Sequence, residues 1–379
     1  MDTRNLLLAG LALAGLLGAC RDPQQGEADE PRAGGTTTLD DRTSSAFSQP
    51  APGLSDSELQ RHRRGDAAFS ATFVAPPAAV NPGLGPLFNH TSCGACHLRD
   101  GRGLAMFSTG QQGSPLLLRV SLPGRDATTG GPLAVPGLGT QLQDHATFGA
   151  TAEVAPSLRW LEEEGHYGDG EAYALRRPRF DLQTPDGSPL SSELQTSARV
   201  PPPVFGLGLL EAIPESELLA HADPEDLDGD GISGRANYVW DAQSSRRVLG
   251  RFGWKANNPT LRQQAAGAYA NDMGVTSTLF PGDGDEVELE DDVLDDTTFY
   301  TQSLGVPARA PHPSSERDRG EALFRSAGCV DCHRETLRTG QHRLAFLSEQ
   351  TLHPYTDLLL HDLGEGLADG RPDFEASGT

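Results

Sequence analysis

The pattern of apolar and polar positions divides the chain into an apolar start, a polar stretch and a long body. Residues 6–19 form an apolar run behind Arg4, which is too short to cross a bilayer comfortably and is typical of an export signal. Residues 21–57 hold almost no apolar side chains, so they predict a flexible tether over 20–57. Residues 55–69 and 315–324 each begin with serine and continue with charged residues, which predicts two helices with one apolar side.

The composition favours a loop-rich globular protein. A length of 379 residues is enough for two ordinary domains. A hydrophobic content of 36% and a mean hydropathy of -0.42 exclude a polytopic membrane protein. The net charge of -23 repels phosphate backbones, so no nucleic-acid partner is expected.

The end of the apolar run carries a second signal. Residues 17–20 read Leu-Gly-Ala-Cys and resemble a bacterial lipobox, in which the cysteine is acylated after the signal peptide is removed. This resemblance predicts a signal peptide over 1–19, lipidation of Cys20 and a location on the periplasmic side of the cell envelope. Arg21 follows Cys20 in place of an aspartate, which favours anchoring in the outer membrane. The alternative is a plain secretory signal with a coincidental cysteine.

The remaining cysteines form two motifs with the same spacing. Residues 93–97 read Cys-Gly-Ala-Cys-His and residues 329–333 read Cys-Val-Asp-Cys-His, and both are C-x-x-C-H, the attachment signature of c-type haem. A thioredoxin-like redox pair would explain neither histidine, and a four-cysteine zinc site normally has its pairs closer together. We therefore expect two covalently bound haems, attached through Cys93, Cys96, Cys329 and Cys332.

A short repeat accompanies the two motifs. Leu87-Phe88 precedes the first motif and Leu323-Phe324 precedes the second with the same spacing. The two predicted helices are similar to the first helix of a cytochrome c domain, in which an aromatic residue packs beside the porphyrin.

The iron ligands decide between electron transfer and catalysis. His97 and His333 are the expected proximal ligands. A six-coordinate haem passes electrons, whereas an iron with an open face can bind peroxide. Met106 and Met273 are the methionines left once Met1 is removed with the signal, and each is either a ligand or a core residue.

The second iron has no methionine after Cys332. It therefore uses a histidine, takes a methionine such as Met273 from elsewhere in the chain, or keeps an open face. His361 is the preferred histidine, because three leucines before it lead toward an apolar interior. Less favoured are His342 and His353, and His145 as a ligand or distal base of the first iron; each histidine could also be an ordinary residue.

Two further features have a functional and a simpler interpretation. Asp226, Asp228 and Asp230 match the first half of a D-x-D-x-D-G calcium loop, but the same pattern fits a solvated acidic turn. Trp254 is either an aromatic bridge between the haems or a buried core residue, and the core interpretation is favoured.

Several stretches resemble the bacterial di-haem oxidoreductase family, whose members are described as peroxidases or thiol oxidoreductases and are distant relatives of di-haem cytochrome c peroxidases. These are residues 85–89 with the first haem motif, 99–103, 202–211, 228–235, 250–255 and 355–362. The resemblance implies two covalent haems, a mainly helical fold and redox chemistry outside the cytoplasm. Family members continue beyond the equivalent of residues 376–378, so the second haem domain is expected to be incomplete at its C-terminus.

Together these observations predict a mainly α protein with two cytochrome c-like haem domains. The first is expected over 58–300, with long insertions between Gly103 and Tyr300, and the second over 301–379. The leading functional hypothesis is a lipid-anchored di-haem oxidoreductase that takes electrons from a small redox protein and reduces a substrate such as peroxide. The alternative is a non-catalytic di-haem electron carrier.

Overall fold

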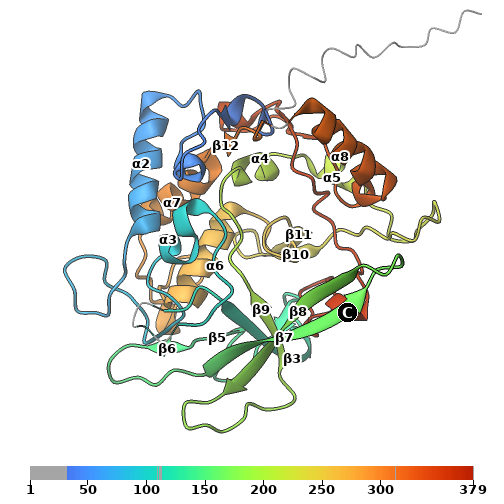
Figure 1. The fold of residues 1–379 in the computed structure, drawn as a ribbon. Helices are drawn as coiled ribbons and strands as arrows, with labels where there is room; N and C mark the ends of the chain where they lie inside the picture. Colours follow the sequence, from blue (N-terminus) through green and yellow to red (C-terminus); the bar gives the residue numbers. More distant parts are fainter. Residues whose placement is uncertain (1–31, 109, 111–112, 312, 379) are drawn as a thin grey trace, which may run out of the picture.

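The computed structural model describes residues 32–108, 110, 113–311 and 313–378. Within these ranges there are seven α-helices (Figure 1): α2 (Asp56–Ser70), α3 (Cys93–Cys96), α4 (Leu207–Glu211), α5 (Glu215–Leu219), α6 (Leu261–Met273), α7 (Asp291–Ser303) and α8 (Ser314–Ser326). The same ranges hold fourteen strands: β1 (Thr38–Leu39), β2 (Leu87–Phe88), β3 (Leu117–Arg125), β4 (Pro132–Leu133), β5 (Gln141–Leu142), β6 (His145–Ala146), β7 (Ala155–His166), β8 (Ala172–Gln183), β9 (Gln195–Arg199), β10 (Tyr238–Asp241), β11 (Arg246–Leu249), β12 (Val306–Pro307), β13 (Leu337–Arg338) and β14 (Thr351–Leu352). With the short 3-10 helices and the isolated β-bridges included, helices hold 26% and strands 22% of the structure, so the fold is mixed and the prediction of a mainly α protein is wrong.

Helix α7 lies at the centre of the helical part. All of its residues from Thr297 to Ser303 are buried, because α2, α4 and α6 pack around it. Gly65 of α2 and Gly208 of α4 allow this close approach: a Cβ atom added at either residue would lie 2.1 Å from a backbone oxygen of α7. The absence of a side chain at these two positions therefore sets the distances between the helices.

The two helices predicted from the sequence are both present. Helix α2 begins at the expected serine, since the Ser55 hydroxyl accepts a hydrogen bond from the Glu58 backbone N–H and the Glu58 side chain accepts one from the Ser55 N–H. This reciprocal capping box satisfies two donors at the helix start. Helix α8 begins at Ser314 with Pro313 as its N-cap, one residue before the predicted start.

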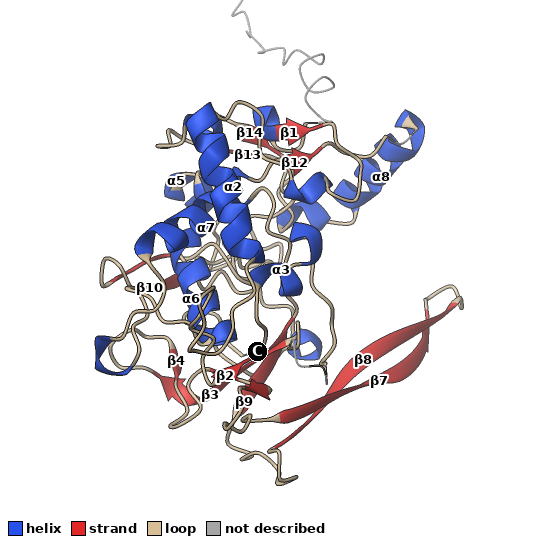
Figure 2. Ribbon diagram, turned by 90° about the vertical axis from the view of Figure 1, so that its left-hand side faces the viewer, coloured by secondary structure: helices blue, strands red, loops and turns tan. Residues whose placement is uncertain are grey.

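Most of the strands between α3 and α4 form a small sheet and a long hairpin, while β6 pairs with β2. In the sheet β3 pairs with β4, β5 and β9, all antiparallel, and its side chains Leu118, Val120 and Leu142 make a separate apolar cluster. Strands β7 and β8 pair with each other from Ala155↔Gln183 to His166↔Ala172 and extend away from the body (Figure 2). The predicted insertions between Gly103 and Tyr300 thus contain the strands that make the fold mixed.

The N-terminal part of the described chain is packed against the body. Strand β1 lies parallel to β12 with Thr38 opposite Val306, Thr37 is 1% exposed and Ala51 belongs to the largest apolar cluster. The predicted flexible tether over 20–57 is therefore wrong for residues 34–51. The earlier part of that segment, together with the predicted signal peptide and Cys20, lies outside the described residues.

The largest apolar cluster joins segments from both sides of the predicted domain boundary at 300/301. It contains Leu209, Ile213 and Phe299 from the first side and Leu337 and Leu347 from the second. Residues 369–377 return to the sheet, and the Arg371 guanidinium lies 3.4 Å from the Val120 backbone oxygen. The two predicted haem regions therefore share a core in this structure.

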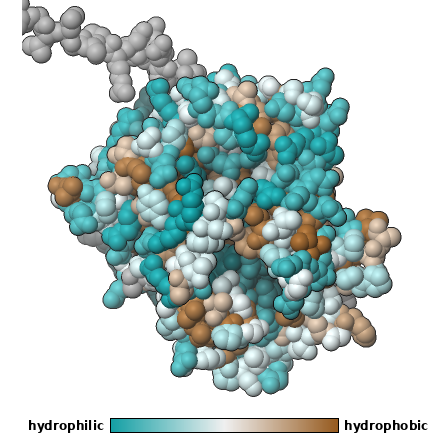
Figure 3. Space-filling model, turned by 180° about the vertical axis from the view of Figure 1, so that it is seen from behind, coloured by the Kyte–Doolittle hydropathy of each residue, from teal (hydrophilic) through white to brown (hydrophobic). Residues whose placement is uncertain are grey.

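The face of the molecule in Figure 3 is mostly hydrophilic, with separate apolar patches and a hollow near its middle. None of the helices in the described ranges has the length and apolar character needed to cross a membrane.

Candidate haem sites

The first C-x-x-C-H motif is held by a single helical turn. The Ser92 hydroxyl accepts a hydrogen bond from the Ala95 N–H and begins α3, so Cys93 and Cys96 lie one turn apart on the same helix. Burial raises the pKa of the Cys93 thiol to about 12, with a smaller contribution from the Asp272 charge. Burial also raises the pKa of the Cys96 thiol, so both thiols are protonated at neutral pH, and neither forms a disulfide.

His97 is oriented by the backbone of a distant segment. Its Nδ1 lies 2.7 Å from the Pro202 carbonyl oxygen, so Nδ1 donates the hydrogen bond and Nε2 is left with its lone pair. Burial lowers the pKa of His97 to about 4, which keeps the imidazole neutral. A neutral imidazole with one nitrogen fixed by a carbonyl is the usual arrangement of a metal-binding histidine.

The second motif repeats this arrangement in a more exposed place. Gly328, in the left-handed region at φ 76°, precedes a short turn over Cys329–Asp331. His333 Nδ1 lies 2.9 Å from the Tyr355 carbonyl oxygen, so here too Nε2 is left to bind iron. His333 is exposed and α8 has no buried residue, unlike the surroundings of His97.

The aromatic residue beside His97 is not the one that the Leu-Phe repeat of the sequence indicated. Phe69 of α2 lies 6.0 Å from the His97 ring and Phe324 of α8 lies 6.1 Å from the His333 ring, between ring centroids. Phe88 instead lies in β2, opposite His145 of β6. The Leu-Phe repeat is therefore not a structural repeat, because the chain leaves a longer loop between α2 and the first motif than between α8 and the second.

The candidate sixth ligands lie in different surroundings. Met273 is 2% exposed within an apolar cluster against which Cys93 also packs. Met106 is 46% exposed on the loop after His97. His145 has its Nδ1 3.0 Å from an Asp144 carboxylate oxygen and its Nε2 2.9 Å from the Gly110 carbonyl, and the hydrogen bond to Asp144 raises its pKa.

His361 is brought directly to the second motif. Its Nδ1 lies 3.6 Å from the Cys332 sulfur, and its Nε2 lies 2.7 Å from an Asp357 carboxylate oxygen. Each ring nitrogen therefore has a partner, and iron binding by His361 would require one of them to be displaced. Away from this pair, the His353 Nδ1 lies 3.2 Å from the Glu335 carbonyl and the His342 Nδ1 accepts from the Leu344 N–H.

Trp254 is not a core residue. Its side chain is 52% exposed, its Nε1 donates to the Val200 carbonyl at 2.7 Å and the Arg102 guanidinium lies 5.4 Å from the ring centroid. The favoured core interpretation is therefore wrong.

The acidic loop gathers a different set of carboxylates from the one predicted. Asp223, Asp226 and Asp228 each place an oxygen within 4.8 Å of the others. Asp230 lies outside this group, and its carboxylate accepts a hydrogen bond from the Ile232 N–H. The sequence pattern missed Asp223, because it lies before the D-x-D-x-D-G motif and is brought to it by the fold of the turn.

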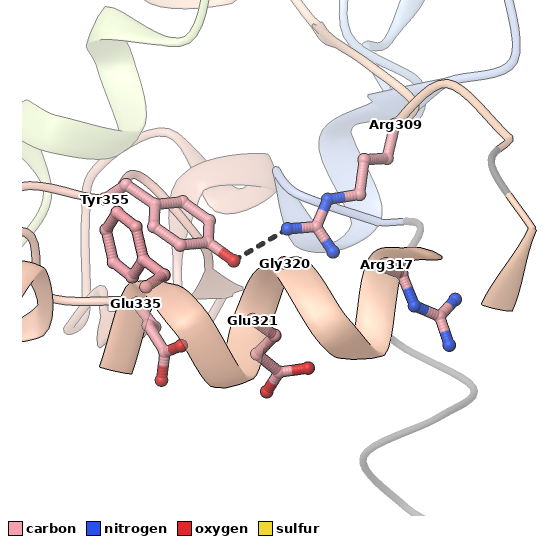
Figure 4. Close-up of a pocket in the computed structure, with 7 residues that line it drawn as sticks. Arg309, Arg317, Gly320, Glu321, Glu335 and Tyr355 are labelled. Carbon is pink, nitrogen blue, oxygen red and sulfur yellow. Dashed lines mark hydrogen bonds between the residues drawn. The ribbon is translucent and has the colours of Figure 1, made fainter. Parts of the chain in front are cut away.

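A small cavity of about 180 Å³ lies beside α8. Figure 4 shows its lining, in which Arg309 Nη2 donates a hydrogen bond of 2.7 Å to the Tyr355 hydroxyl. Its remaining lining residues are Arg317, Gly320, Glu321, Phe324 and Glu335. The volume is below that of an ordinary ligand pocket, so the cavity is not itself a haem pocket.

The sequence does not indicate that several residues lie beside the two motifs. Pro202 and Tyr355 act through backbone oxygens, which any residue type supplies. Tyr300 and Asp100 form a buried pair beside Phe69, and they are 200 positions apart in the chain. Only the resemblance of segments 99–103, 202–211 and 355–362 to a known family marked these regions.

The residues present fit covalently attached haem at both motifs. Each motif has two unpaired thiols and a histidine whose Nδ1 hydrogen bond leaves Nε2 to bind the metal. No curated protein and no solved structure matches the chain. The family model described as "di-haem oxidoreductase, putative peroxidase" matches residues 28–287 and 282–379. These matches cover most of the chain, which therefore belongs to the di-haem oxidoreductase family.

Proposed function

We propose that this protein passes electrons through two covalently bound haems to peroxide. The observation that carries the proposal is the pair of C-x-x-C-H motifs, in each of which a backbone carbonyl holds the proximal histidine in the same orientation. The family description supports the choice of a peroxidase over a pure carrier. Haem supplies an iron that can bind and reduce peroxide when its distal face is open.

The different exposure of the two histidines supports a division of roles. His333 and the whole of α8 are solvent-accessible, so the second site suits electron input from a small redox protein. His97 is half-buried and kept neutral by its surroundings, which suits chemistry away from bulk water. The Pro202 and Tyr355 carbonyls fix each imidazole, so that ligand and porphyrin need little reorganisation during electron transfer.

The test uses the holoprotein with both haems attached. We expect high-spin ferric haem, carbon monoxide binding by the reduced protein and consumption of hydrogen peroxide with a reduced donor. The double variant Cys329→Ala/Cys332→Ala should carry one haem, still bind carbon monoxide and lose most of its turnover, because electron input is removed. Two low-spin haems that bind no carbon monoxide would contradict the peroxidase proposal and leave an electron carrier.

The cell-envelope location is a proposal from the N-terminal sequence. The apolar run over 6–19 and Cys20 support export, lipidation and anchoring on the periplasmic side, where c-type haem proteins can meet a small redox partner. The acidic charge of -23 argues against nucleic acid as a partner. The intact mass of the mature protein, before and after removal of ester-linked lipid, tests the anchor at Cys20.

Calcium binding by the acidic loop is a further part of the proposal. Asp223, Asp226 and Asp228 offer hard oxygen ligands, and Arg235, just after the loop, pairs with Leu360 beside His361. An ion there would stiffen the segment next to the second haem motif. A rise in melting temperature with added calcium, absent in Asp226→Asn, is the expected result.

A further inference from the structure

Each proximal histidine is the first of three aromatic rings in contact. At the first site the rings of His97 and Phe69 lie 6.0 Å apart, and Tyr300 follows at 5.3 Å from Phe69. At the second site the rings of His333 and Phe324 lie 6.1 Å apart, and Tyr355 follows at 5.7 Å. Both haems therefore have a tyrosine at the same number of ring contacts from the iron ligand.

The two phenol groups have opposite electrostatic surroundings. Tyr300 is 1% exposed, and its hydroxyl donates a hydrogen bond of 3.0 Å to a carboxylate oxygen of Asp100, which is itself 6% exposed. The Tyr355 hydroxyl accepts a hydrogen bond from Arg309, whose guanidinium carbon also lies 5.7 Å from the ring centroid. One phenol thus faces an acceptor for its proton, and the other faces a positive charge.

This difference decides which tyrosine can lose an electron. An oxidised phenol is a strong acid, so its oxidation becomes easier when a nearby base takes the proton and harder when a cation faces it. Burial, followed by the charges of Asp100 and Asp66, raises the pKa of Tyr300 above its ordinary value. Tyr300 therefore keeps its proton until an electron is removed.

We infer that Tyr300 is a redox-active residue that supplies one electron to the first haem, and that Tyr355 is not. This inference depends on the proposed peroxidase function, because peroxide is the oxidant. With haem attached at the first motif and peroxide as the oxidant, Tyr300 would supply one electron to the haem, and its phenolic proton would move along the hydrogen bond to Asp100. The products are a neutral tyrosyl radical and a protonated Asp100, and one electron from the redox partner, with return of the proton, restores both.

Tyr300 and Asp100 together would allow a substrate that takes two electrons to be reduced by a donor that gives one at a time. Peroxide takes two electrons, while a small redox protein delivers them one at a time. A buried Tyr300 can hold one oxidising equivalent between the two deliveries, because its low exposure keeps the radical away from solvent and other molecules.

The experiment mixes the holoprotein with hydrogen peroxide, freezes it and records the optical and electron paramagnetic resonance spectra of the same sample. Wild type should give a tyrosyl signal whose hyperfine structure changes when the protein contains ring-deuterated tyrosine. Tyr300→Phe should lose the signal, and Tyr355→Phe, the matched control at the second site, should keep it. Asp100→Asn should give less radical, because an amide accepts the hydrogen bond but not the proton; asparagine also tolerates the positive φ of 60° at this position.

The two spectra separate failure of the inference from failure of the proposed function. An optical change of the haem without a tyrosyl signal, or a signal that persists in Tyr300→Phe, overturns the inference and leaves the peroxidase function intact. An unchanged haem spectrum overturns both. A haem content of two in each variant shows that the substitutions have not disturbed folding or attachment.

Discussion

At the scale of single residues, buried polar groups near the first motif are joined to one another by hydrogen bonds and ring contacts. The Asp100 carboxylate accepts hydrogen bonds from Tyr300 and Ser48, and the His62 ring packs 4.9 Å from Tyr300 with its Nδ1 2.8 Å from the Ser303 hydroxyl. The sequence marks none of these as functional, because a lone histidine or tyrosine on a helix is usually a core or surface residue. Their roles follow from the neighbours that the fold gives them, which the sequence does not show.

The buried His62 should make stability depend on pH. Burial lowers its pKa to about 4, while its pKa in the unfolded chain is about 6.5. Between these values the unfolded state binds more protons, so stability rises with pH and falls as pH drops from about 6.5 to about 4. We expect wild type to lose up to about 3 kcal/mol more than His62→Asn over this range, measured as the free energy of unfolding in urea. Equal losses in the two proteins would contradict the assignment.

At the scale of elements, the helices around α7 depend on glycine at the contacts and the strands depend on partners far along the chain. Gly65 brings the backbones of α2 and α7 together, whereas β3 takes partners from β4, β5 and β9. The cap at Ser55 and the charged, one-sided pattern predicted α2 and α8, since both signals are local. Eight of the fourteen described strands were missed because they are two residues long and are defined only by what lies beside them.

Two glycine-to-alanine substitutions separate close packing from helix propensity. In Gly65→Ala the new Cβ would lie 2.1 Å from the Asp296 backbone oxygen, so we expect a loss of about 1–3 kcal/mol from overpacking. A Cβ atom added at Gly320 of α8 would meet no atom within 4 Å. Gly320→Ala should therefore raise the free energy of unfolding by up to about 1 kcal/mol, because alanine has the higher helix propensity. Thermal unfolding followed by circular dichroism measures both, and the inference of close α2–α7 packing fails should Gly65→Ala be neutral.

At the scale of the whole molecule, polar contacts tie the end of the described chain to the sheet. Asp369 contacts two distant segments, the turn at Lys255 and strand β9: its carboxylate lies 2.7 Å from Lys255 Nζ, 2.7 Å from the Ser197 hydroxyl and 3.0 Å from the Arg199 guanidinium. Together with the shared core of Phe299 and Leu347, these contacts make the predicted first and second haem regions parts of one folded body.

Asp369 should stabilise this arrangement at neutral pH and lose that effect in acid. Burial alone would raise its pKa, but hydrogen bonds from Lys255 and Ser197 outweigh burial and hold the pKa below its usual value. A lowered carboxyl pKa gives stability that is present above about pH 3.9 and is lost as pH falls through the folded-state value. Asp369→Asn should therefore be about 2 kcal/mol less stable than wild type at pH 7, with the difference closing in acid.

The control for this prediction is Asp283→Asn, which removes the same charge on an exposed loop. It should unfold like wild type at every pH. A constant difference between Asp369→Asn and wild type from neutral to acid pH would show that lost packing, and not the carboxylate charge, is responsible.

The sequence by itself determined the chemistry that needs only neighbouring residues. Two cysteines and a histidine within five positions predict thioether attachment and an iron ligand, and a serine with glutamate three residues later fixes the start of a helix, because the interacting groups are joined by a short stretch of backbone. Tertiary structure decided what depends on distant segments: the pairing of β1 with β12, the choice of Phe69 over Phe88 beside His97, and the contrast between Asp100 at Tyr300 and Arg309 at Tyr355. These contacts form between groups far apart in the chain, so neither their residue types nor their spacing leaves a periodic pattern that the sequence alone could reveal.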